Sequence, residues 1–166
     1  VQAEDYISYF DTTASNEGGA SYRNDAVDIE VTTDVGGGYN IGYTQATEWL
    51  EYPVTLSAGT YTISSRVASD SGGGNYTLSI NGNTIGSDNV ASTGGWQTFE
   101  TQVVNSFLTT SGTFTLRLAI NAGSFNINWL QITAVIDDDL DGISNDLDLC
   151  PDTLENAEIN EVGCAD

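Results

Sequence analysis

Aromatic residues whose strand parity does not fit a core are the side chains of this chain best placed to do chemistry. In the stretch 91–104, ASTGGWQTFETQVV, side chains alternate between two faces, and we expect Phe99 and Val103 to mark the buried face. Trp96 has the opposite parity, which it shares with Glu100. A tryptophan on a polar face either seals the end of a core or forms a binding surface.

Trp49 and Tyr43 raise the same question. Trp49 shares its parity with Glu51 and lies opposite the apolar face that begins at Leu50, whereas Tyr43 ends a short run just before the polar loop TQAT. A pyranose has an apolar face of C–H bonds on which an aromatic ring can stack. Its polar edge of hydroxyls suits asparagine, which is both donor and acceptor. Because ligand sites combine a mostly apolar lining with a few polar groups, these rings favour sugar binding.

The charge of the chain narrows the class of ligand. Its 166 residues carry 24 acidic side chains, 3 arginines and no lysine or histidine, which gives a net charge of −21. Nucleic acids need cationic contacts to phosphate, and anionic membranes repel such a surface, so we expect neither as a partner. No apolar run approaches the roughly 18 residues that span a bilayer. Neutral polysaccharides and divalent cations remain as ligands.

Catalysis is not expected from these residues. Without histidine, the Ser-His and Cys-His arrangements cannot form within the chain. Glycoside hydrolysis needs two carboxylates that face each other across a cleft. Glu48 and Glu51, at a spacing of three, point to opposite faces of a strand. A pair of carboxylates distant in the sequence remains the alternative.

Short strands must position the aromatic side chains. Apolar alternation recurs over residues 27–33, 48–56, 60–67, 75–86, 113–120 and 125–136. Asn81-Gly82 predicts a hairpin turn, Pro53 indicates a sheet edge or a bulge, and parity places Trp129 in the core. Seven or more short strands joined by glycine-rich connections predict an all-β fold, a β-sandwich, over residues 1–136.

A break in charge divides the chain. Residues 1–136 hold 13 acidic side chains and 3 arginines, a net of −10, whereas residues 137–166 hold 11 acidic side chains and no basic ones, a net of −11. We therefore expect a domain boundary at residue 136/137. Both cysteines, Cys150 and Cys164, lie in the acidic segment. An isolated pair predicts an extracellular disulfide; zinc is the competing interpretation, but further Cys or His ligands are missing.

The acidic segment carries regularly spaced oxygens. From its first residue it reads D-x-D-x-D-G-x-x-N-x-x-D, with Gly142 at position 6. This spacing resembles the calcium-binding loop of an EF-hand, although no flanking helix pattern is present. The ligands that this resemblance implies are Asp137, Asp139, Asp141, the main-chain carbonyl of Ile143, Asn145 and Asp148. A solvated, disordered acidic linker is the alternative.

Five segments together resemble carbohydrate-binding module family 6. They are VQAEDY, YRNDAVDIE, GGGYNIGYTQATEWLEYPV, GGWQTFE and GSFNINWLQI, they follow the family's order, and they cover about residues 1–136. The resemblance implies a β-jelly-roll sandwich in which loops at one end hold a sugar ring between Tyr43 and Trp96. It implies that Asn126 hydrogen-bonds the sugar, with Asn128 as the alternative.

The same resemblance implies a second sugar site in some members, on the concave face of a sheet. The counterpart of its tryptophan is Trp49, and Glu30 is the acidic residue expected to reach this face. The family motif there is Gly-Asp-Trp, whereas this chain has Thr47-Glu48-Trp49, so the second site departs from the family pattern.

Resemblance implies one calcium site in the sandwich and one or more in the acidic segment. The family carries a structural calcium near its N-terminus, whose ligands here would be Gln2, Glu4 and the main-chain carbonyl of about Arg23. Gln2 stands where the family has a carboxylate. The acidic segment, followed by Cys-Pro and a second cysteine, resembles a thrombospondin type 3 repeat, a disulfide-closed calcium-binding spacer.

These observations predict a non-catalytic module that binds a polysaccharide and targets an attached glycoside hydrolase to it. The runs YRNDAVDIE and NIGYTQATEWLEY are most similar to modules of marine agarases, so agarose or its oligosaccharides is the expected ligand. Xylan, β-1,3-glucan and chitosan are alternatives, and so is a calcium-dependent structural or adhesion module. We expect a secreted, bacterial, monomeric protein of which this chain is a mature or excised part.

Overall fold

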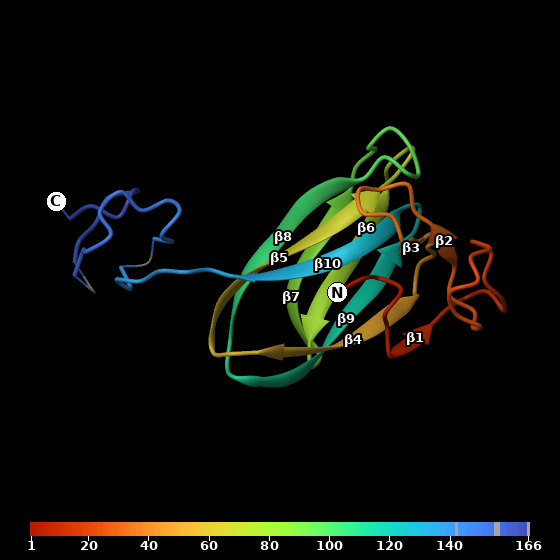
Figure 1. The fold of residues 1–166 in the computed structure, drawn as a ribbon, viewed down its shortest axis with the longest axis horizontal. Coiled ribbons are helices and arrows are strands. Elements are labelled where there is room, and N and C mark those ends of the chain that lie inside the picture. The colour runs from red at the N-terminus through yellow and green to blue at the C-terminus, as the bar shows by residue number, and fades with distance from the viewer. Residues whose placement is uncertain (142, 155–156, 166) are drawn as a thin grey trace. The chain divides into compact units, whose positions relative to one another are not determined.

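Ten strands pair as two five-stranded antiparallel sheets in a computed structural model that describes residues 1–141, 143–154 and 157–165. The strands are β1 (Ser8–Phe10), β2 (Ile29–Val31), β3 (Tyr39–Ile41), β4 (Trp49–Leu56), β5 (Gly59–Ala68), β6 (Gly74–Ile80), β7 (Asn83–Val90), β8 (Glu100–Thr109), β9 (Gly112–Ala122) and β10 (Asn126–Ala134). One sheet has the order β1-β4-β9-β6-β7 and the other β2-β3-β10-β5-β8 (Figure 1). The predicted all-β sandwich is confirmed.

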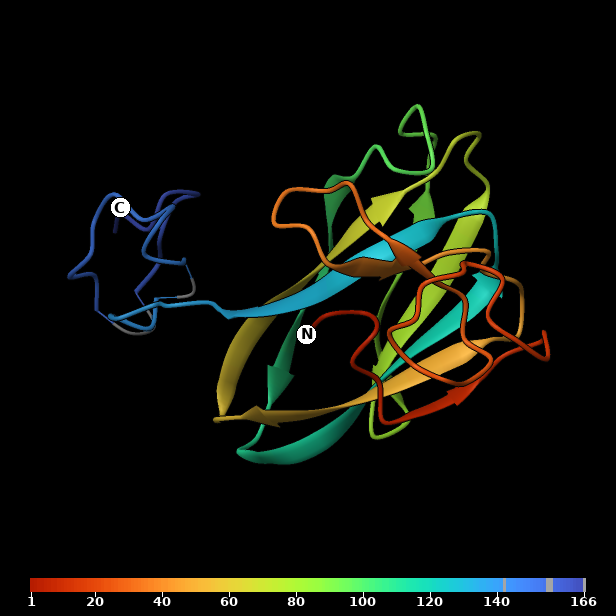
Figure 2. The ribbon, with the colours of Figure 1, turned by 45° about the vertical axis from the view of Figure 1, so that its right-hand side comes forward.

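The core lies between the two sheets, which the turned view separates (Figure 2). Period-2 alternation buries Leu50 and Tyr52 from β4 against Leu116 and Leu118 from β9, and Tyr52 pairs with Leu116 across the two strands. These residues lose nearly all contact with water, and burial of apolar surface is the main stabilising term of such a fold.

The predicted turn chemistry is present. Asn81 and Gly82 join β6 to β7, both with positive φ, as a two-residue hairpin turn of this type requires. β1 pairs only with residues 49–51 of β4, so beyond that point one edge of β4 is unpaired in the part of the chain described. Pro53, which lacks an N–H, falls in this edge region while pairing with β9 on the other side.

Two core predictions, those for Val103 and Trp129, are wrong. Val103 is 67% exposed, and Val104 packs against the core instead. Phe99 is buried but lies before β8, which begins at Glu100, so its burial does not set the parity of the strand that carries Val103. In β10, Leu130 belongs to the core, whereas Trp129 is only half-buried.

The chain divides into two compact units, Val1–Thr133 and Ala134–Asp166. In the second unit, a disulfide joins Cys150 to Cys164 and an isolated β-bridge joins Ile159 to Ala165. The predicted disulfide is confirmed. No helix long and apolar enough to cross a membrane occurs among the described residues.

Candidate functional site

One cavity of about 280 Å³ is lined by four side chains that are distant in the sequence, Glu30, Tyr43, Trp96 and Asn126. The two aromatic rings are solvent-accessible, Tyr43 at 53% and Trp96 at 46% exposure, whereas Asn126 is buried. Two accessible rings above buried polar groups can hold a flat ligand that has an apolar face and a hydroxylated edge.

Strand register explains why the polar residues of the cavity gather on one face. Ile29, Ile41 and Ile127 lie side by side on β2, β3 and β10 and point into the core. Their sequence neighbours Glu30 and Asn126 therefore point to the opposite side of the same sheet. The three strands are adjacent, so these two side chains come together across 96 residues of sequence.

The Tyr43 loop is fastened to the turn that precedes β10. The Thr44 hydroxyl donates to the carbonyl of Phe125 at 2.6 Å and accepts from the Phe125 N–H at 3.3 Å. The approach is so close that a Cβ at Gly123 would lie 1.8 Å from the Thr44 carbonyl oxygen, so glycine is required there. Tyr43 has φ of +48°, a conformation that non-glycine residues rarely adopt.

The Trp96 loop is held from two sides. The Asn126 side-chain amide donates to the Trp96 carbonyl at 2.8 Å. The Thr93 hydroxyl donates to the Ser69 carbonyl at 3.1 Å and accepts from the Ser69 N–H at 2.8 Å. Hydrogen bonds thus link both loops to β10 or to the turn before it, which positions the backbone of both aromatic residues before any ligand binds.

Glu30 is the hub of the cavity floor. Its Oε2 accepts from the side-chain amides of Asn40 at 3.1 Å, Gln97 at 3.3 Å and Asn126 at 2.8 Å. The Asn126 amide thus donates to Glu30 and to the carbonyl of Trp96, and its Oδ1 is the atom left to face a ligand. The floor therefore presents acceptors, which suits a ligand whose edge carries hydroxyl donors.

The prediction that Glu30 reaches the Trp49 face is wrong, because Glu30 extends from β2 and Trp49 from β4, in the other sheet. Two members of the floor, Asn40 and Gln97, escaped the sequence analysis. The signal that could have found Asn40 is the alternation around Ile41, which repeats the pattern around Ile29. Gln97 lies in a loop, where alternation carries no information.

Asn128 does not line the cavity. It is buried, and its amide donates to Asp34 at 2.9 Å. Asp34 also forms a two-point ion pair with Arg66, at 2.7 and 2.9 Å. The Arg66 hydrogen bonds lower the pKa of Asp34 to about 2, with a smaller contribution from Asn128. Asn128 therefore tethers the segment between β2 and β3 rather than reaching the cavity.

Trp49 is half-buried on the outer face of β4, away from the loop cavity. The Arg117 guanidinium lies 4.0 Å from the centre of its ring and pairs with Glu51 at 2.7 Å. One face of the Trp49 ring is thus occupied by a cation–π contact, which leaves less of it for sugar stacking.

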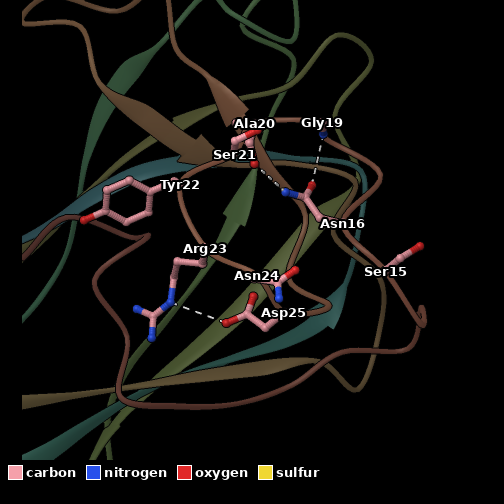
Figure 3. A pocket seen from close by; sticks show the side chains of 9 residues that line it. All are labelled: Ser15, Asn16, Gly19, Ala20, Ser21, Tyr22, Arg23, Asn24 and Asp25. Atoms are coloured by element: carbon pink, nitrogen blue, oxygen red, sulfur yellow. Dashed lines mark hydrogen bonds and ion pairs between the residues drawn. The ribbon is translucent and has the colours of Figure 1, made fainter.

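The predicted N-terminal calcium ligands differ in burial and in their partners. Glu4 is 5% exposed, and its Oε2 has no hydrogen-bond partner in the described chain; burial raises the pKa of this carboxyl. An unpartnered buried carboxylate oxygen fits a cation. The Arg23 side chain donates to the Glu4 carbonyl at 3.1 Å and pairs with Asp25, the latter contact drawn in Figure 3. Gln2 is exposed and bridges to Trp129.

In the acidic unit, carboxylate oxygens of Asp137, Asp139 and Asp141 lie within 4.8 Å of one another. Asp141 Oδ2 is buried and lacks a hydrogen-bond partner among the described residues, which again fits a cation. The Ile143 N–H donates to Asp141 Oδ1 at 2.8 Å. Asp148 accepts from the Cys150 N–H and lies beside Asp141, because a Cβ at Gly163 would meet carboxylate oxygens of both residues within 3.0 Å. Asn145 bonds through both side-chain atoms to Asp138. Gly142 lies outside the described residues.

Known proteins place this arrangement in a family. The family described as carbohydrate binding module (family 6) matches residues 19–134. The clotting factor G alpha subunit of Tachypleus tridentatus is 37% identical over 139 residues, 81% of this chain, and the chain spans 18% of that relative's length.

Solved structures agree with the fold. A family 6 module of Cellvibrio mixtus lichenase 5A, in complex with cellotriose, is 35% identical with a TM-score of 0.67 over 82% of this chain and 96% of its own. The C-terminal family 6 module of the Zobellia galactanivorans laminarinase LamC is 31% identical with a TM-score of 0.66, over 80% and 96% of the two chains. The chain belongs to carbohydrate-binding module family 6, and its sandwich is a non-catalytic carbohydrate-binding module.

Proposed function

We propose that the module binds a neutral polysaccharide in the cavity between Tyr43 and Trp96. The observation that carries this proposal is the pair of accessible aromatic rings over a floor of Glu30 and Asn126. The rings stack on the apolar faces of a sugar, and the floor accepts hydrogen bonds from its hydroxyls. A net charge of −21 disfavours sulfated or uronic-acid polymers, which the acidic surface repels.

Agarose and β-glucans are the polysaccharides to compare. Two sequence runs, over residues 22–30 and 40–52, are similar to agarase modules and support agarose. The module of lichenase 5A is in complex with cellotriose, and a Bacillus halodurans module that is 30% identical to this chain, with a TM-score of 0.64, binds β-1,3-glucan. The match covers 81% of this chain and 94% of the Bacillus halodurans module. We keep agarose as the first ligand to test and β-glucans as the second.

We infer that the module serves a larger secreted enzyme. A binding module held beside a glycoside hydrolase raises the local concentration of the hydrolase on an insoluble polymer. The acidic unit of residues 134–166 then serves as a spacer of the thrombospondin type 3 kind. Its disulfide and its oxygen-rich loop support this role.

We further propose two structural calcium ions. Glu4 is the principal ligand of one, with Gln2 and the carbonyl of about Arg23, and the aspartates 137, 139 and 141 hold the other. Calcium prefers carboxylate and carbonyl oxygens, and the unpartnered buried oxygens of Glu4 and Asp141 suit it. Calcium neutralises buried charge here and leaves sugar recognition to the loop cavity.

Affinity electrophoresis tests the sugar proposal, in calcium-containing gels cast with agarose, laminarin, xylan or chitosan. We expect one polymer to retard the wild-type chain and Trp96→Ala to abolish that retardation. Trp49→Ala, on the other sheet, is the matched control and should be retarded like the wild type. Retardation of a folded Trp96→Ala variant equal to the wild type would overturn the proposal. A chain that no polymer retards would favour a structural or adhesion module.

A further inference from the structure

Buried carboxylate oxygens without a hydrogen-bond partner mark three places in the described chain. They are Glu4 Oε2, Asp28 Oδ2 and Asp141 Oδ2. Two of these oxygens, those of Glu4 and Asp141, lie where calcium is already proposed above. Asp28 belongs to neither place, so its orphaned oxygen needs a separate explanation.

Asp28 is held in place by main-chain contacts. Asp28 is 1% exposed, and its Oδ1 accepts a hydrogen bond from the Glu17 N–H at 2.5 Å. Its carbonyl accepts from the Gly42 N–H at 2.8 Å. Oδ1 and the main-chain carbonyl therefore have partners, and Oδ2 is the acceptor of Asp28 that is left for an ion.

The chain supplies no cation to this carboxylate. It has three arginines and no lysine or histidine. Each arginine pairs elsewhere, Arg23 with Asp25, Arg66 with Asp34 and Arg117 with Glu51. A buried carboxylate without a counter-charge is strongly unfavourable, so it is either protonated or bound to a cation from solution.

The surroundings of Asp28 are themselves negative. Burial, followed by the charges of Asp11, Glu17 and Glu48, raises the pKa of Asp28 to about 6. Glu48 is 5% exposed and accepts from the N–H and hydroxyl of Thr12. The negative charges of these carboxylates create an electrostatic potential that attracts a divalent cation to the unpartnered Oδ2 of Asp28.

We propose that Asp28 Oδ2 binds a calcium ion that is distinct from the two proposed above, with Asp11 and Glu17 contributing the nearby negative charge. Within the described residues, only the aspartates of the acidic unit already bring three carboxylate oxygens within 4.8 Å. At Asp28, main-chain oxygens and water must therefore complete the coordination shell, as the flexible geometry of calcium permits.

This ion would brace the loop that carries Tyr43. Asp28 is hydrogen-bonded to Gly42, which directly precedes Tyr43. Glu48 joins the segment at Thr12 to the Gln45 N–H, at 2.8 Å, on the other side of the same loop. A calcium ion at Asp28 would thus fasten the N-terminal loop, residues 11–17, to the cavity wall.

Calcium counting tests the proposal independently of sugar binding. Chelator-treated wild type and variants would be dialysed against calcium, and bound metal would be measured by inductively coupled plasma mass spectrometry. We expect Asp28→Asn, which keeps the acceptor for Glu17, to bind one calcium fewer than the wild type. Asp70→Asn, an exposed carboxylate after β5, is the control and should bind as many as the wild type. A folded Asp28→Asn variant with an unchanged calcium count would overturn the proposal.

A crystal of the wild-type chain grown with calcium keeps the test independent of how the variant folds. Anomalous scattering should place a peak about 2.3–2.6 Å from Asp28 Oδ2. Peaks at Glu4 or in the acidic unit without one at Asp28 would contradict the proposal while leaving the other calcium sites and the sugar site standing.

Discussion

At the scale of single residues, Glu30 sets the polarity of the cavity floor. One oxygen of its carboxylate accepts three side-chain amides and so fixes which atoms face the ligand. Glu30→Gln replaces a charged acceptor by a group that also donates, which disrupts these bonds. We expect sugar affinity to fall about tenfold or more, because a hydrogen bond to a charged group contributes roughly 1.5–3 kcal/mol. Isothermal titration calorimetry measures this change.

Glu51→Gln is the matched control, because Glu51 pairs with Arg117 on the other sheet. The sugar affinity of the Glu51→Gln variant should equal that of the wild type. Equal affinities for Glu30→Gln and the wild type would show that the carboxylate plays no part in recognition.

Single residues also show how far parity reasoning reaches. The sequence predicts the exposure of Trp96 from its parity opposite Phe99 and Val103. That argument fails in part, because Val103 is exposed too. Trp96 lies in the loop between β7 and β8, outside the alternation that was used to place it. Burial of Asn126 and Asn128 could not be read from the sequence, because neighbouring loops cover them and alternation reports only the face of the sheet.

At the scale of elements, a hydroxyl group fastens the Tyr43 loop to the turn before β10. Thr44→Val keeps the side-chain shape but removes both contacts to Phe125. We expect the free energy of unfolding to drop by about 1–3 kcal/mol, because two buried backbone groups lose their partner. Sugar affinity should fall as well, since the ring of Tyr43 is no longer held in position.

Thr62→Val provides the comparison, because the partner of the Thr62 hydroxyl within the described part of the chain is the Ser106 side chain on the sheet surface. Denaturant unfolding and calorimetry should both leave this variant near the wild type. If the two threonine variants bind sugar equally well, the loop is not positioned through Thr44.

The segment between β2 and β3 is tethered by Asp34, which makes its stability depend on pH. Because Arg66 lowers the pKa of Asp34 to about 2, below its ordinary value, the stabilisation is present above about pH 4 and is lost as pH falls towards 2. From that shift we expect Asp34→Asn to be less stable than the wild type by about 2 kcal/mol at pH 7. The difference should shrink steadily below pH 4.

Thermal or urea unfolding of both chains between pH 7 and pH 2 measures this difference. Asp70→Asn, whose carboxylate is on the surface, should differ from the wild type by a small amount at every pH. A constant difference between the wild type and Asp34→Asn down to pH 2 would rule out the ion pair as its source.

At the scale of the whole molecule, the two units carry separate stabilising devices. A hydrophobic core holds Val1–Thr133, whereas a disulfide closes the unit Ala134–Asp166. A crosslink with a sequence separation of 14 contributes on the order of 3 kcal/mol to the unit it closes. We expect reduction to speed proteolysis within residues 134–166 and to leave the unfolding midpoint of the sandwich unchanged. A lower midpoint for the sandwich after reduction would contradict this independence.

Charge and alternation in the sequence predicted the overall architecture better than the arrangement of residues in the cavity. The sandwich, the Asn81-Gly82 hairpin and the disulfide all followed from local patterns that one strand or one loop carries. The cavity could not be assembled in the same way. Glu30 meets Asn126 only because β2, β3 and β10 are neighbours, and this order is a property of the long-range topology. The pairing of Tyr43 with Trp96 was predicted from the resemblance to a family, because no local pattern in the sequence shows that their two loops meet.

The central claim, that sugar binds between Tyr43 and Trp96, is tested most directly by the indole N–H resonances. The chain has three tryptophans, Trp49, Trp96 and Trp129, so its NMR spectrum holds three such signals, which single Trp→Phe variants assign. Agaro-oligosaccharide, laminari-oligosaccharide and cellotriose would be titrated in turn. The account predicts that a binding sugar shifts the Trp96 signal and leaves the Trp49 and Trp129 signals in place. A sugar that shifts Trp49 while Trp96 stays unmoved would contradict it.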